Sequence, residues 1–254
     1  MGWGKTPFHT GGALLYTEEV CVELTRRHHT VAHLCSGCYD FHIMPYIRES
    51  VTMRRGVVYK VFYFMNDPNM YYNWNEPLND CDHRIVREMV RKVVRDFDPD
   101  IVHIQDMPGF CGSVIPMIRD MGVGVIVSLP NYWYLCPRVE LIDYRGKVCD
   151  DFKEGRKCSI CVPKISTKIA KVMEMINFVF NPILGMLFKS DLLRELARRA
   201  YYAFSMERSK FTVGSQENAA DDEERGRLFF ERREALITYL NEADKIIAKS
   251  SFLR

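Results

Sequence analysis

The sequence lacks several features that would assign a broad class at once. It contains no uninterrupted apolar run of about 18 residues, so a membrane-spanning helix is not expected. Its charge is nearly balanced, with 35 lysines and arginines against 33 aspartates and glutamates, which gives no reason to expect nucleic-acid binding. It has no internal repeat, and its first residues lack the charged and apolar regions of a secretory signal.

Hydrophobic residues are plentiful, and their order indicates an α/β domain. They make up 47% of the 254 residues, which is enough for one large core or two small ones. Strand-like apolar runs alternate with stretches of helical periodicity. We expect strands at 30–35, 56–64, 101–105, 123–129 and 245–249, and helices at 14–27, 78–97, 110–121 and 227–243. This alternation predicts a Rossmann-like, doubly wound parallel sheet with right-handed crossovers.

Two segments depart from the alternation. Only about ten residues precede the glycine pair Gly11-Gly12, whereas the glycine-rich turn of a nucleotide-binding α/β domain follows a first strand. We therefore expect the first strand to be missing. Residues 163–239 have helical patterns and the charged stretch SQENAADDEERGR, which predict a helical insertion and a solvated linker. The Rossmann-like domain is then expected to comprise 1–162 and 240–254.

Polar residues lie where a ligand site of an open α/β sheet is expected. His103 and Gln105 share one face at the end of the predicted strand 101–105, and such sheets bind ligands at the carboxyl ends of their strands. His103 either faces a ligand or is a core histidine with hydrogen-bonded ring nitrogens. Gly11 and Gly12 precede a helix, whose first N–H groups favour a phosphate, or they form an ordinary loop.

Nine cysteines without a secretory signal indicate a reducing compartment, where clustered thiols bind metal more often than they form disulfides. Four of them have the spacing C-x12-C-x8-C-x2-C, namely Cys136, Cys149, Cys158 and Cys161. Such a set can provide the four tetrahedral ligands of a structural Zn²⁺ and staple a long loop. Disulfides or free thiols are the alternative. The pair Cys35 and Cys38 could instead join Cys158 and Cys161 at one metal.

A resemblance to a known family runs along much of the chain. The order TPFHTGG, ELTRRHHTVAHLCSG, FDPDIVHIQ, VIVSLPNYWYLCPR, C-x8-C-x2-C and EADKIIAKSSFLR resembles the amino-terminal half of family 4 glycosyltransferases, over most of 7–161 and 240–254. These enzymes have the GT-B fold of two facing Rossmann-like domains. The resemblance implies an acceptor-side domain, with the nucleotide-sugar held by a carboxyl-terminal domain that is expected to be absent here. The acceptor- or phosphate-binding residues that it implies are Gly11, Gly12, His103, Gln105, Asn131, Tyr132 and Arg138.

The sequence departs from the family at the motif itself. The family has His-Asp before Tyr-Trp, with the histidine next to the reacting sugar, and this chain has Pro130-Asn131. Proline cannot exchange a proton, so no catalytic residue is assigned. The second histidine of the family's His-x-His is Gln105. Tyr132 and Trp133 either stack on a sugar ring or pack the loop.

The resemblance implies transfer of a sugar from a nucleotide-sugar donor to a glycan or lipid-linked acceptor, in cell-surface glycan biosynthesis. Without a partner donor-binding domain, this chain is expected to be inactive. The alternatives are a non-catalytic acceptor-binding or scaffold subunit with a structural zinc loop, and a zinc-containing interaction module unrelated to sugars. We expect a cytoplasmic protein, peripheral at the inner membrane face. The apolar segment 169–188, flanked by lysines, either lies in a membrane interface or packs on the sheet as a helical subdomain.

Overall fold

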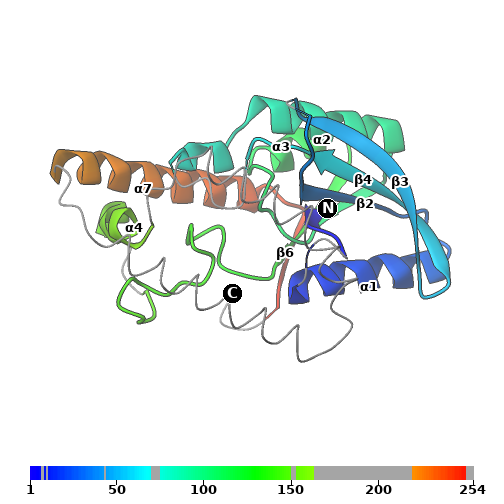
Figure 1. Cartoon of the computed structure of the whole chain (residues 1–254), viewed down its shortest axis with the longest axis horizontal. Helices are drawn as coiled ribbons and strands as arrows, with labels where there is room; N and C mark the ends of the chain where they lie inside the picture. Colours follow the sequence, from blue (N-terminus) through cyan, green and yellow to red (C-terminus); the bar gives the residue numbers. More distant parts are fainter. Residues whose placement is uncertain are drawn as a thin grey trace.

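The computed structural model describes residues 1–6, 9, 11–42, 44–69, 75–149, 153–162 and 219–249. Over these residues the chain is α/β, with a mostly parallel mixed sheet and flanking helices, which is consistent with a Rossmann-like fold (Figure 1). Most of the predicted helical insertion, including 169–188, lies outside the described residues. Among the helices that the structure describes, none has the length and apolar character needed to cross a bilayer.

The strands form two hydrogen-bonded sets. The first has the order β1 (Gly2–Trp3), β2 (Ala32–Cys38), β4 (Val57–Met65), β3 (Tyr46–Arg54), and the second has the order β5 (Ile101–Ile104), β6 (Gly124–Leu129), β7 (Lys245–Ala248). All neighbouring strands in these sets are parallel except β3 and β4. Backbone hydrogen bonds of Met1, just before β1, join the sets, because the Gln105 N–H donates to the Met1 carbonyl (2.8 Å) and the Met1 nitrogen donates to the His103 carbonyl (2.7 Å).

This connection corrects the prediction that the first strand is missing. β1 occupies the central position, between β2 and β5, and it pairs in parallel with β2 through Gly2–Cys35 and Trp3–Ser36. A strand of two residues is too short to produce a periodic hydrophobic pattern, so it could not be recognised from the sequence. The carboxyl ends of β1, β5 and β6 therefore open toward the same edge of the sheet.

The β3–β4 hairpin was not expected, since only its second strand has a strong strand pattern. Arg55 and Gly56 connect the strands, and both have positive φ angles (48° and 79°), as a two-residue type I′ turn requires. β3 is an edge strand whose side chains are mostly exposed, so its polar sequence YIRESVTMR lacks the alternation of a half-buried strand. β3 thus lies between the two strands predicted at 30–35 and 56–64, where no strand was predicted.

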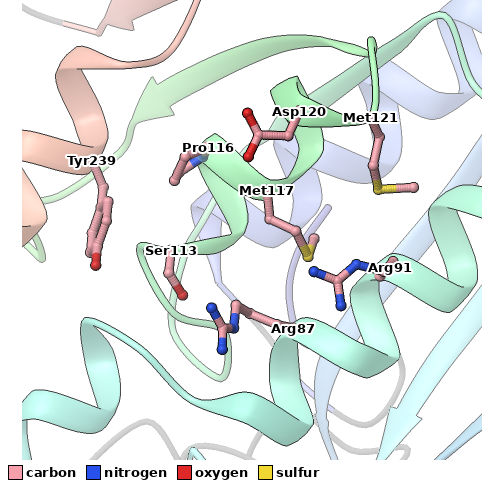
Figure 2. Close-up of a pocket in the computed structure, with 8 residues that line it drawn as sticks. All are labelled: Arg87, Arg91, Ser113, Pro116, Met117, Asp120, Met121 and Tyr239. Atoms are coloured by element: carbon pink, nitrogen blue, oxygen red, sulfur yellow. The ribbon is translucent and has the colours of Figure 1, made fainter.

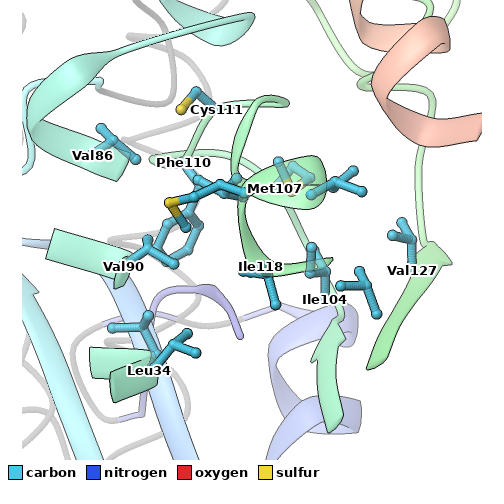
Figure 3. Close-up of a cluster of buried hydrophobic side chains, with 14 of the residues drawn as sticks. Leu34, Val86, Val90, Ile104, Met107, Phe110, Cys111, Ile118 and Val127 are labelled. Atoms are coloured by element: carbon cyan, nitrogen blue, oxygen red, sulfur yellow. The ribbon is translucent and has the colours of Figure 1, made fainter. Parts of the chain in front are cut away.

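Helices cover both faces of the sheet (Figure 1). On one face, α1 (Gly12–Arg26) buries Cys21 and Val22 in a cluster with residues of β2 and β4. On the other face, α2 (Arg84–Phe97), α3 (Val114–Asp120) and α7 (Ala219–Asn241) enclose a larger core, part of which is drawn in Figure 3. Short helices complete the described chain: η1 (Pro77–Asp80), η2 (Lys153–Gly155) and α4 (Arg156–Cys161). This arrangement agrees with the predicted doubly wound sheet.

The carboxyl-terminal helix is longer than the sequence indicated. α7 begins at Ala219, so the stretch AADDEERGR, predicted to be a solvated linker, forms its first turns. Farther along, Phe229 and Leu236 are buried, and Leu236 belongs to the larger core. Arg232 is also buried: its Nε donates to Asp80 Oδ2 (2.6 Å) and its Nη2 donates to the Trp133 carbonyl (3.0 Å). Tertiary contacts thus stabilise a helix whose exposed residues are mostly charged.

Candidate functional site

Polar side chains meet at the carboxyl ends of β5 and β6. His103 Nε2 lies 2.9 Å from Ser128 Oγ, and Gln105 Nε2 lies 3.0 Å from His103 Nδ1. Burial lowers the pKa of His103 to about 4, with a smaller contribution from the nearby positive charge of Lys249, so its imidazole is neutral at pH 7. The ring nitrogens have partners, as expected of a core histidine, yet the ring is only partly buried, as a ligand-facing residue requires.

Asp106, two residues after the end of β5, is the residue of this site that the sequence interpretation missed. Burial raises the pKa of its carboxyl group to about 6, and the opposing effects of Asn131 and Lys249 are smaller. Asn131 Nδ2 donates a hydrogen bond to Asp106 Oδ1 (3.2 Å). A carboxylate with a pKa near neutrality, at the end of a parallel strand, has the properties of a general base. Its position after the His103-x-Gln105 pattern was the available signal.

The start of α1 borders the same region. Lys249, which follows β7, places its Nζ 4.2 Å from the centre of the Tyr16 ring and acts electrostatically on Asp106. Tyr16 lies one helical turn after Gly12, so both residues are on one side of α1. Gly11 and Gly12 are exposed, and a Cβ atom built on either would meet nothing within 4 Å. No side chain caps this helix start, so its first N–H groups can bind an anion.

In the motif that follows β6, Asn131 belongs to the polar site and Trp133 belongs to the core. Asn131 faces the site through Asp106, and its Oδ1 accepts a hydrogen bond from the Trp133 N–H (3.0 Å). Trp133 is buried, with the Arg232 guanidinium 4.9 Å from its ring centre, so it packs the loop and is not available for stacking on a sugar. Tyr132 is partly buried, and stacking by its ring stays a prediction.

The predicted metal ligands form a second group, in the loop between β6 and α7. Cys136, Cys149, Cys158 and Cys161 line one cavity of about 20 Å³. Burial raises the pKa of Cys158 to about 12, and the other three cysteines raise it further. None of the nine cysteines forms a disulfide. Over the residues that the structure describes, no three His, Cys, Asp or Glu side chains have the arrangement of a formed metal site.

The structure of this loop bears on two other predictions, the one for Arg138 and the one for the pair Cys35 and Cys38. Arg138 lines the cysteine cavity, so the structure separates it from the polar group around Asp106. Cys35 and Cys38 lie fully buried on β2, in the cluster beneath α1, and their thiols donate to the carbonyl groups of Phe62 and Ser36 (both 3.6 Å). They do not line the cysteine cavity. The alternative that they share a metal with Cys158 and Cys161 is therefore wrong.

A larger cavity, of about 310 Å³, lies between α2, α3 and α7 (Figure 2). Arg87 and Arg91 line one side of it, Ser113 and Asp120 lie on or beside α3, and Tyr239 belongs to α7. None of the residues that the sequence analysis assigned to a site lines it. Size alone therefore does not identify the functional region, and the strand ends carry the chemistry.

Comparison of the chain with protein-family models, with curated proteins and with solved structures returned no match. The fold and the arrangement of the side chains are therefore the basis for the functional assignment.

Proposed function

We propose that this chain is the acceptor-binding side of a GT-B glycosyltransferase of the family 4 type. The proposed reaction transfers a sugar from a nucleotide-sugar to a hydroxyl group of a glycan or a lipid-linked acceptor. Three features support it: the α/β sheet with its site at the carboxyl edge, the sequence motifs, and the polar group around Asp106. The hydrogen-bonded pair of Asp106 and Asn131, at the carboxyl ends of β5 and β6, is the single observation that carries the proposal.

Asp106 is the proposed partner of the acceptor hydroxyl group. With a pKa of about 6 it is mostly ionised at pH 7, so it can accept a hydrogen bond or a proton from that hydroxyl. The Asn131 side-chain amide orients the carboxylate by donating to Asp106 Oδ1, and neutral His103, held by Ser128 and Gln105, lies at the same strand ends. Catalysis in such a site rests on holding the acceptor oxygen against the donor carbon, which is a positioning effect.

Positive potential beside Asp106 suits the anionic part of a substrate. The first N–H groups of α1 and the Lys249 ammonium lie on the side of α1 that carries Tyr16. A phosphate or diphosphate, whether of a lipid carrier or of a leaving nucleotide, is stabilised by such groups. A lipid-linked acceptor would bring the protein to a membrane surface, in keeping with the proposed peripheral location.

One observation favours the alternative of a non-catalytic acceptor-binding subunit. Pro130 stands where the family has the histidine next to the reacting sugar, and proline has no ionisable group. In that case the groups around Asp106 bind the acceptor without assisting its reaction. The two functions differ in turnover when a donor-binding domain is added, because the transferase then forms product and the scaffold subunit does not.

Acceptor binding by the full chain tests the proposal. We would measure binding of short glycans and of a water-soluble polyprenyl-diphosphate sugar by saturation-transfer NMR, for wild type, D106N and K249A. Loss of the hydrogen bond to a charged group predicts at least about tenfold weaker binding for D106N. R91A, altered in the cavity between the helices, is the matched control and should bind as wild type does. Equal binding by wild type, D106N and K249A would refute the site.

Turnover of the donor is a separate measurement. UDP-sugars and GDP-sugars incubated with the 254-residue chain should release no nucleoside diphosphate, because the resemblance assigns donor binding to another domain. Robust release by the purified chain alone, abolished in D106N, would contradict the assignment to the acceptor side.

A further inference from the structure

The four cysteines of the loop after β6 come together from three separate stretches of the chain. Cys136 follows the aromatic motif, Cys149 ends a small hairpin, and Cys158 and Cys161 lie on α4. Residues up to 25 positions apart in sequence thus line one cavity. We infer that these four thiols bind one Zn²⁺ ion in a structural site that ties the loop to α4, which packs against α7. Zinc binding by these thiols does not require the proposed sugar chemistry.

Local backbone geometry prepares two of the ligands, Cys149 and Cys161. The bridge between Ile142 and Val148 turns the chain back, and Asp143 Oδ1 holds this turn by accepting hydrogen bonds from the N–H groups of Arg145 (2.8 Å) and Lys147 (3.0 Å). The Tyr144 N–H donates to Cys161 Sγ (3.2 Å). An N–H donor of this kind stabilises a thiolate, because it is directed at the negative charge on sulfur.

The spacing on α4 suits two ligands of one ion. Cys158 and Cys161 are three residues apart on a helix, so their side chains lie on one face. In a tetrahedral site with Zn–S distances of about 2.3 Å, neighbouring sulfurs are about 3.8 Å apart. The cavity of about 20 Å³ is large enough for one small sphere.

The charges around the cavity also fit a thiolate site. Four thiolates and one Zn²⁺ have a net charge of −2, which is costly to bury without cations nearby. Arg138 and Lys157 line the cavity, and the buried Arg232 of α7 acts electrostatically on Cys158. These cations would be poorly placed beside an apolar, neutral cluster, and they compensate the charge of a metal-bound one.

Metal binding in the cysteine loop should also affect the polar site around Asp106 at the strand ends. Arg232 acts electrostatically on Cys158 and donates a hydrogen bond to the Trp133 carbonyl. The Trp133 N–H in turn donates to Asn131, the partner of Asp106. Fixing the loop with a metal therefore fixes the segment that orients the Asp106 carboxylate. Removal of the ion should loosen this segment and leave the distant β3–β4 hairpin unaffected.

Metal analysis of the full chain tests the inference. Protein purified under reducing conditions without chelators should contain one zinc per chain, measured by inductively coupled plasma mass spectrometry. C158S and C161S should lose the zinc. C111S is the matched control and should keep it, because the buried Cys111 lies outside the cavity, against Ser113.

Cobalt substitution keeps the test valid if a variant does not fold. Wild type stripped of zinc and supplied with Co²⁺ should develop the intense visible absorption of tetrahedral cobalt–thiolate coordination, and Zn²⁺ should abolish it. Wild type that contains no zinc and gives no cobalt absorption would overturn the inference. So would a disulfide between any two of the four cysteines in freshly purified, zinc-free protein.

Discussion

Glu18 is a fully buried carboxyl group and Asp106 a partly buried one, and they differ in how completely their charge is compensated. Glu18, on α1, is fully buried and accepts hydrogen bonds from Lys5 Nζ (3.2 Å), from the backbone and side chain of Thr6, and from Arg54. Asp106 accepts one side-chain hydrogen bond, from Asn131. A carboxylate with a full set of partners contributes to the fold, whereas one with few partners and a raised pKa can take part in chemistry.

The contrast extends to the lysine near each carboxylate. Lys5 is 3% exposed, lies 5.5 Å from the Tyr59 ring centre and pairs with Glu18, so its ammonium group is committed to the core. Lys249 is exposed and acts on Asp106 from a distance. A lysine in the second environment can bind an anionic ligand without breaking a buried ion pair.

The largest loss of unfolding free energy is expected when the buried ion pair between Lys5 and Glu18 is removed. Glu18→Ala leaves Lys5 buried without its partner and should lower the free energy of unfolding by about 3–5 kcal/mol. Urea denaturation measures this loss. Glu19→Ala is the control, because Glu19 is partly exposed and pairs with Arg54 and Arg55 at the surface, where the effect should be about 0–1 kcal/mol. Equal losses in the two variants would remove the distinction.

Breaking the buried pair between α7 and η1 should have the next largest effect. Arg232→Met removes the partner of Asp80, whose carboxyl pKa burial already raises, and should cost about 3 kcal/mol of unfolding free energy at pH 7. Arg227→Met, an exposed change on the same helix, should cost less than about 0.5 kcal/mol. Because protonated Asp80 no longer needs a cation, the cost should shrink as the pH falls. A cost that is independent of pH would contradict this explanation.

Asp106→Asn should act in the opposite direction on stability. The pKa of Asp106 rises from 3.8 to about 6 on folding, so between these values the folded protein binds a proton that the unfolded chain has released. Wild-type stability therefore falls as the pH rises through this window. The asparagine of D106N does not ionise, so the stability of this variant does not fall in this pH window. D106N should therefore be more stable than wild type at pH 7 by up to about 3 kcal/mol, with no difference near pH 4.

Denaturation of both proteins from pH 4 to pH 8 measures this difference. Asp96→Asn, at an exposed position of α2, is the control and should leave the pH profile unchanged. A variant with weaker acceptor binding and higher stability would mark Asp106 as a residue retained for function at the expense of stability. Lower stability of D106N at pH 7 would instead give it a structural role like that of Glu18.

The smallest effect on stability is expected from a change of Tyr16, whose ring contacts the Lys249 ammonium group. Tyr16→Leu removes the aromatic face beneath the ammonium group and should cost about 0.5–1 kcal/mol of stability. A less fixed Lys249 should also raise the pKa of Asp106 further, which carboxyl-carbon NMR can follow. Tyr144→Leu removes a similar contact, with Arg145, in the cysteine loop and should not change that pKa. An unchanged Asp106 pKa in both variants would separate Lys249 from the site.

Much of the fold could be predicted because its signals are local. The predicted ranges for α1, β5, β6 and β7 agree with the structure to within a few residues, since each is a regular run of apolar residues bounded by turn residues. β3 was missed because an exposed edge strand needs no apolar alternation, and β1 because two residues have no period. The first turns of α7 were misassigned because their charged residues are typical of a linker as well as of a helix surface.

The site was only partly predictable. His103, Gln105 and Asn131 could be assigned because they stand at strand ends, whose position in an α/β sheet follows from the chain order. Arg138 was grouped with them because of its closeness in sequence to Asn131, and the structure shows that it lines the cysteine cavity. Asp106 was overlooked because its pKa depends on burial, which is a tertiary property.

The sequence by itself determined the α/β alternation and the edge of the sheet at which polar groups gather, because hydrophobic periodicity and strand ends are properties of neighbouring residues. Only the tertiary structure decided which charges are compensated. Glu18 is compensated by residues 12 to 36 positions away, while Asp106 is reached by Asn131 and Lys249 from two other strand ends. The partners of a buried charge come from distant parts of the chain, so their number is set when the sheet and helices pack together.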